Sequence, residues 1–200
     1  LQQTNTSFPQ GSSSWPYPNR AAATAAQMHC RRQQSNGTTH LETIHGLTCL
    51  VADAICTPAA KAFWQHTGLG ASSRLAAVAL GHDTAPDPED GASARCSVVR
   101  RLAAIYDCEP EAISLHPSGM AALHRALELV CDADPTRPVL QIGFPYVDVL
   151  KLPQMVFAGA ELLLDDRAAS VQSALDSLRP AAVVVEAVSY THLRAHETLT

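Results

Sequence analysis

Short apolar segments alternate with amphipathic segments in the second half of this chain, and no other feature restricts the fold as strongly. Runs rich in Val, Leu and Ile cover residues 138–144, 160–166 and 181–188. Each has the length and composition of a buried β-strand. Residues 170–178 lie between the last two runs and have helical spacing, with Ser170 as the expected N-cap. This alternation predicts a parallel sheet covered by helices on both faces.

Two segments upstream also have helical periodicity, over residues 93–107 and 121–130. Each carries one apolar stripe, so we expect both helices to pack on one side. The first stripe consists of Val98, Leu102 and Ile105, and the second of Leu123, Leu127 and Val130.

Composition limits the partners of the chain. Its 200 residues are 46% hydrophobic and carry a net charge of -5, so they can form one good-sized core but no basic surface for nucleic acid. No apolar run approaches the roughly 18–20 residues that span a bilayer, and we expect no membrane partner. The six cysteines include no CxxC pair, which favours reduced thiols and a cytoplasmic location over a disulfide framework.

The first part of the chain differs in character. Residues 1–56 are rich in Ser, Thr, Gln, Asn and Ala without a sustained apolar period, and we expect a poorly ordered polar extension. The spacings of its histidines and cysteines fit none of the usual zinc-ligand pairs, so no metal site is predicted. Residues 57–187 form the expected folded domain.

A compact turn, Pro117-Ser118-Gly119, precedes the segment at residues 121–130. Backbone N–H groups at a helix N-terminus, together with the helix dipole, suit a phosphate. The Ser118 hydroxyl can add a donor, and Gly119 lets the backbone approach a ligand closely. The same residues also suit a plain N-cap followed by a turn glycine, and the local pattern alone favours that second interpretation.

Three blocks follow one another in order: WQHTGLGASSR at 64–74, HPSGMAALHRAL at 116–127 and IGFPYVDVLKL at 142–152. Together they resemble the cystathionine gamma-synthase family, especially its fungal-type branch, over roughly residues 57–186. Members of this family are fold-type I enzymes that depend on pyridoxal phosphate. The resemblance therefore implies a three-layer fold, with a mostly parallel sheet between helices, of which this chain holds the N-terminal part.

The resemblance also implies a cofactor site made from two of these blocks. Backbone N–H groups of Gly119 and Met120 would bind the phosphate of pyridoxal phosphate, with Ser118 beside them. The Tyr146 ring would stack on the pyridine and exclude water from it. Without the resemblance, an aromatic residue at this place after a strand would be interpreted as part of the core. We expect the Ser118 turn and the Tyr146 ring to face each other.

The family pattern matches other residues less completely. Ser72, Ser73 and Arg74 either reach the active site or form a solvated helix start. Arg95 is a candidate for the arginine that the family supplies to the phosphate from a neighbouring subunit, whereas His66 fits a structural role better than a catalytic one. The match ends near residue 187, and residues 188–200, VSYTHLRAHETLT, resemble translated adapter sequence rather than native protein.

The activity that the resemblance implies is γ-replacement, in which the thiol of cysteine displaces the γ-substituent of an activated homoserine ester, carried out by a homo-oligomer on small amino-acid substrates. A cystathionine lyase or a sulfhydrylase of the same family is an alternative, as is a catalytically inert α/β binding protein derived from it. Pyridoxal phosphate needs a Schiff-base lysine. Neither Lys61 nor Lys151 is the expected nucleophile, so we predict no catalytic residue in this chain and no activity from it alone.

Overall fold

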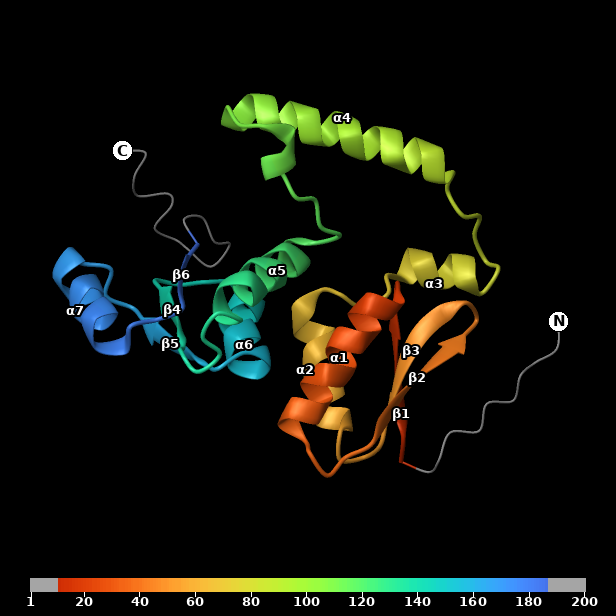
Figure 1. The fold of residues 1–200 in the computed structure, drawn as a ribbon, viewed down its shortest axis with the longest axis horizontal. Helices are drawn as coiled ribbons and strands as arrows, with labels where there is room; N and C mark the ends of the chain where they lie inside the picture. The colour runs from red at the N-terminus through yellow and green to blue at the C-terminus, as the bar shows by residue number, and fades with distance from the viewer. Residues whose placement is uncertain (1–10, 187–200) are drawn as a thin grey trace.

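A computed structural model describes residues 11–186 and shows an α/β protein with two three-stranded sheets, one antiparallel and one parallel. Helices α1, α2, α5 and α6 lie between the two sheets, and α7 lies on the far side of the parallel sheet (Figure 1). Within the described residues, no helix is both long and apolar enough to cross a membrane. The tail at residues 188–200, interpreted from the sequence as non-native, lies outside the described part of the chain.

The antiparallel sheet is built from the N-terminal segment. Its strands are β1 (Ser13–Tyr17), β2 (Thr39–Ile44) and β3 (Leu47–Ala52), in the order β1-β3-β2. A two-residue turn joins β2 to β3, and both of its residues, His45 and Gly46, have positive φ values of 49° and 82°. Such a turn matches the twist of the paired strands and fixes their register.

Helix α1 (Arg20–Gln33) packs on this sheet, and the prediction of a poorly ordered N-terminal extension is wrong for residues 11–56. Tyr17 and Leu50 are fully buried. The helix buries alanines and one cysteine rather than large apolar residues, so its periodicity is invisible to a search for Val, Leu and Ile. The buried residues of α1 are Ala22, Ala23, Ala26, His29 and Cys30.

The parallel sheet confirms the alternation predicted from the sequence. Its strands β4 (Val139–Ile142), β5 (Ala160–Leu163) and β6 (Ala182–Val185) pair in the order β5-β4-β6, with both pairings parallel. The strands are shorter than predicted, and β4 ends where Gly143 takes a φ of 82°. Helix α6 (Val147–Val156) connects β4 to β5, and α7 (Ala168–Leu178) connects β5 to β6.

The two crossover helices lie on opposite faces of the parallel sheet, α6 toward the centre of the molecule and α7 outside (Figure 1). The right-handed rule for parallel crossovers requires this, because the two connections run in opposite directions across the sheet. All four residues of the central strand β4 are buried. Helix α7 begins one turn earlier than expected, with Arg167 rather than Ser170 at the N-cap position.

Helix α2 (Thr57–Thr67) is the centre of the molecule. It packs against α1 and β1 on one side and against α5 (Gly119–Cys131) and α6 on the other. A single hydrophobic core therefore runs from Tyr17 through Phe63 to Val156, across the boundary predicted at residues 56 and 57. As predicted, α5 packs on the parallel sheet, where it contacts β6, and Leu127 is buried; Val130 of the predicted stripe is 45% exposed.

Three further elements connect the two halves: α3 (Ser73–Ala79), α4 (Pro88–Tyr106) and the 3-10 helix η1 (Pro110–Ala112). Helix α4 exists as predicted, but the expectation that its stripe packs on the core is wrong. Val98 and Ile105 are 45% and 73% exposed, and Ala103 is the buried residue of the helix. Figure 1 shows α4 standing apart from both sheets.

Candidate functional site

The N-terminus of α5 combines a helix cap with two available donors. Ser118 has extended backbone angles, and its Oγ accepts a hydrogen bond of 3.1 Å from the Ala121 N–H. Ser118 is therefore the N-cap, as the local pattern favoured. The Gly119 and Met120 N–H groups, which precede the first bond of the helix ladder, remain available to a ligand. Gly119 is exposed, and a Cβ added there would meet no atom within 4 Å.

Gly68 holds this turn against the end of α2. It is the C-cap of α2, with a φ of 67° in the left-handed region. A Cβ on Gly68 would collide with the Ser118 Oγ and would lie 2.9 Å from the Ala121 N and 3.0 Å from the Met120 Cβ. Only glycine allows this close approach without strain. Two blocks that are about fifty residues apart in the sequence therefore meet backbone to backbone.

Tyr146 lies at the carboxyl edge of the parallel sheet, in the loop from β4 to α6. Its N–H donates a 2.6 Å hydrogen bond to Oε2 of Glu186, the residue that follows β6. The described connections leave β4 and β5 through helices on opposite faces of the sheet. Open α/β proteins bind ligands at this carboxyl edge. The Tyr146 side chain is 45% exposed, so the interpretation of this residue as a core aromatic is excluded.

A pair of polar side chains joins Tyr146 to the end of α2. His66 is buried in the last turn of α2, and its Nδ1 lies 3.4 Å from Oδ1 of Asp148 without a well-formed hydrogen bond. A hydrogen bond to Asp148, together with the charge of that carboxylate, raises the pKa of the Tyr146 hydroxyl. Tyr146 is therefore a neutral donor at pH 7, and the Asp148 carboxylate lies between the tyrosine and the histidine.

The Ser118 turn and Tyr146 both connect to the C-terminal end of α2, each through other residues. The Ser118 turn contacts Gly68, while Asp148, the partner of Tyr146, reaches His66 two residues earlier in the same helix. Both halves of the expected cofactor site therefore lie at the C-terminal end of α2. The direct face-to-face arrangement of the turn and the Tyr146 ring stays a prediction.

The less certain sequence candidates lie around this site. The Ser72 Oγ accepts a 3.2 Å hydrogen bond from the Leu75 N–H and caps α3, and Ser73 and Arg74 are exposed in its first turn, which is the solvated helix start considered from the sequence. The Arg95 guanidinium donates to the Leu115 carbonyl at 3.3 Å, which links α4 to the segment that leads into the Ser118 turn.

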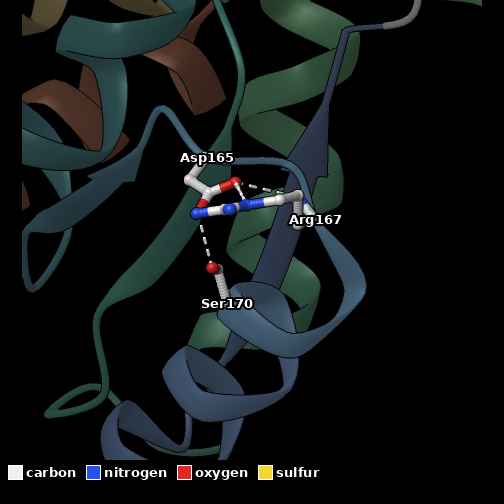
Figure 2. Close-up of polar contacts among 3 residues, drawn as sticks. All are labelled: Asp165, Arg167 and Ser170. Atoms are coloured by element: carbon white, nitrogen blue, oxygen red, sulfur yellow. Dashed lines mark hydrogen bonds and ion pairs between the residues drawn. The ribbon is translucent and has the colours of Figure 1, made fainter.

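A local ion pair follows strand β5, between the end of this strand and the start of α7 (Figure 2). The Asp165 carboxylate accepts from the Arg167 guanidinium at 2.6–3.0 Å and from the Ser170 hydroxyl at 2.5 Å. These bonds, the arginine's first, hold the pKa of Asp165 well below its usual range. The carboxylate is already fully engaged, so it orders the start of α7 and is unsuited to act as a general base.

Sequence reasoning missed Asp148, Glu186 and Gly68 as parts of this site. Asp148 was visible as the acid two residues after Tyr146, and Glu186 as the first polar residue after a strand. Their proximity to His66 and to the tyrosine backbone depends on strand order, which the sequence does not specify. The described residues contain no group of three or more His, Cys, Asp or Glu side chains that could hold a metal ion.

No protein-family model, curated protein or solved structure matches this chain. Its function has to follow from its own residues.

Proposed function

We propose that this chain is part of a pyridoxal-phosphate-dependent enzyme of the cystathionine gamma-synthase type, with a fold-type I arrangement. The parent enzyme would replace the γ-substituent of an activated homoserine ester with the thiol of cysteine and would act as a homo-oligomer. The site at the C-terminal end of α2 would hold the phosphate and the ring of the cofactor.

One observation carries this proposal: the three blocks of family-like sequence meet at a single place. Gly68 of the first block approaches Ser118, Met120 and Ala121 of the second, and His66 of the first lies 3.4 Å from Asp148 of the third. Nothing in the spacing of these blocks along the chain requires them to be neighbours. Their convergence near the carboxyl edge of a parallel sheet supports a shared binding site.

The donors present fit a phosphate. Ser118 satisfies the Ala121 N–H, and the remaining N–H groups of Gly119 and Met120 point out of the positive end of a 13-residue helix. The Ser118 hydroxyl still has a proton to donate, since it accepts rather than donates in the cap. The open space around Gly119 leaves room for the anion.

The ring end of the cofactor would depend on Tyr146. Asp148 accepts a hydrogen bond from its hydroxyl, and Glu186 accepts one from its backbone N–H. These two contacts hold Tyr146 at the edge of the sheet. When bound, the cofactor supplies an electron sink for chemistry at the amino-acid carbons. Both lysines, Lys61 and Lys151, are exposed residues of α2 and α6, and neither is adjacent to the Ser118 turn in the chain. We expect reversible binding and no turnover from these 200 residues alone.

Pyridoxine 5′-phosphate tests the proposal on the full chain, because it has no aldehyde and cannot react with exposed lysines. Its intrinsic fluorescence allows equilibrium titration. We expect weak binding that inorganic phosphate displaces. Gly119→Pro should weaken this binding about tenfold, since it removes one charge-assisted hydrogen bond. Proline is well tolerated at the first helical position after an extended residue, so the helix should persist.

Gly119→Ala is the matched control, because it adds a Cβ into open space and keeps the N–H. It should bind the ligand like the unmodified chain. Pyridoxine without the phosphate should bind at least about tenfold more weakly and should not distinguish the two variants. Equal binding of pyridoxine and its phosphate, or equal losses in the alanine and proline variants, would exclude the phosphate cradle. Absence of any binding would favour an inert α/β protein.

A further inference from the structure

A second candidate site lies at the C-terminal end of α5, opposite the Ser118 turn, where three helices end. A cavity of about 320 Å³ is lined by the last residues of α1 (Arg32 and Gln33), of α5 (Cys131, with its C-cap Asp132) and of α6 (Val156). Its volume falls at the lower end of the range of small-molecule pockets. None of the residues proposed to bind pyridoxal phosphate lines it.

Aromatic rings form the inner wall of this cavity. The ring of His124 lies between those of Phe63 and Phe157, with centroids 5.6 Å from each. His124 is 4% exposed and lines the cavity. The three rings give the inner wall of the cavity a flat, apolar surface for a ligand.

The electrostatics of the cavity favour a positive ligand. Glu128 and Asp132 on α5 are balanced by Arg125, which pairs with Glu128 at 2.6 Å, and by Arg32 on the opposite rim. Burial lowers the pKa of His124 and raises that of Cys131, so both are neutral at pH 7. What remains is the negative end of three helix dipoles, each equivalent to roughly half an elementary charge.

We propose that this cavity binds a small organic cation with a flat, apolar body. The aromatic wall would receive the body of the ligand, through stacking and cation–π contacts with the phenylalanine rings. The three helix C-termini and Asp132 would hold its charge. A cation of this kind would bridge α1, α5 and α6, which meet around α2, and would therefore bind the folded chain selectively.

Three probes of nearly identical shape test the charge requirement: benzamidinium, benzamide and benzoate. Binding to the full 200-residue chain can be measured by ligand-observed NMR titration. We expect benzamidinium to bind at least about tenfold more tightly than benzamide, and benzoate not to bind, because three helix ends and one carboxylate act on the charge. Equal affinities for benzamidinium and benzamide would overturn the proposal, as would failure of both to bind.

Two variants test the location. Ala25→Leu introduces a larger side chain on the α1 wall and should abolish binding of benzamidinium. Asp132→Asn should weaken it about threefold or more, whereas Asp90→Asn, an identical charge change on the separate helix α4, should leave it unaltered. Equal affinity in the two asparagine variants would show adsorption to the acidic surface and would overturn the site. That pair decides the question even if circular dichroism shows that Ala25→Leu does not fold.

Discussion

Gly68 shows at the scale of one residue how the candidate site is assembled. Its left-handed backbone ends α2, and its missing side chain makes room for the Ser118 turn. The positive φ and the close approach are two separate requirements for glycine. Another glycine of the chain meets only the first of them. Gly46, in the β2–β3 turn, also has a positive φ, but a Cβ there would meet nothing within 4 Å.

We predict that Gly68→Ala lowers the free energy of unfolding by about 2–4 kcal/mol, the sum of left-handed strain and forced displacement of the α5 N-terminus. Gly46→Ala should cost only the strain, roughly 1–2 kcal/mol. Urea denaturation of both variants measures the difference. Equal costs would show that the α2–α5 approach in the structure is looser than described.

Single residues also mark the limit of what the sequence predicts. The N-cap role of Ser118 could be predicted because it depends on three neighbouring residues and on the helix that follows. The N-cap of α7 could not, because Ser170 bonds instead to Asp165, whose carboxylate is fixed by Arg167. The hydrogen bond between Ser170 and Asp165 replaces the capping role that the local sequence predicts for Ser170.

Among the elements, the three parallel strands were predictable and the antiparallel sheet was not. The runs around Val139, Leu162 and Val184 are rich in large aliphatic residues and are separated by helical segments, which is the pattern of a buried parallel sheet. In residues 11–56 most of the buried positions are alanine or cysteine, and Leu50 and Val51 are the large aliphatic residues among them. Small residues fill a core just as well where backbones approach closely, but they give a weaker hydropathy signal than the aliphatic runs of the parallel strands.

Helix α4 gives a prediction at the same scale. Nineteen residues long and almost entirely exposed, it packs among the described elements chiefly on the short η1. Most of the stability of a helix in a protein comes from tertiary packing of its apolar face, and the apolar stripe of α4 is largely exposed. Its amides should therefore exchange with solvent at least about tenfold faster than those of α2, which lies at the centre of the core. Native-state hydrogen exchange measures both in one experiment, and equal protection would contradict the exposed position of α4.

The whole molecule is held by one core, so its stability should respond to the buried histidine at the centre of that core. His29 is 1% exposed, stacks on Phe63 at 5.3 Å, and has no hydrogen-bond partner for either ring nitrogen. Burial, followed by the charge of Arg32, lowers the pKa of His29 from 6.5 to about 4. Between pH 6.5 and pH 4, the unfolded chain therefore binds a proton at His29 more strongly than the folded protein does.

We predict that the free energy of unfolding is constant with respect to His29 above pH 6.5, falls between pH 6.5 and pH 4, and levels off below. The loss at pH 5 should be about 2 kcal/mol. His29→Phe keeps the ring stack, removes the titration, and should lose correspondingly less stability between pH 7 and pH 5. His82→Gln, at an exposed position, is the control and should behave like the unmodified chain. Identical pH profiles for all three proteins would contradict the burial of His29.

The tight turn at His45 and Gly46 has a consequence for the order in which the molecule assembles. Strands β2 and β3 are joined by two residues and can zip together in microseconds, whereas β4 can meet β6 only after some forty residues and two helices are in place. On the ribosome the hairpin also emerges first. The half of the chain with the weaker hydropathy pattern therefore provides the first folded surface. Helix α2 can pack on it before α5 and α6, which cover its other side, are synthesised.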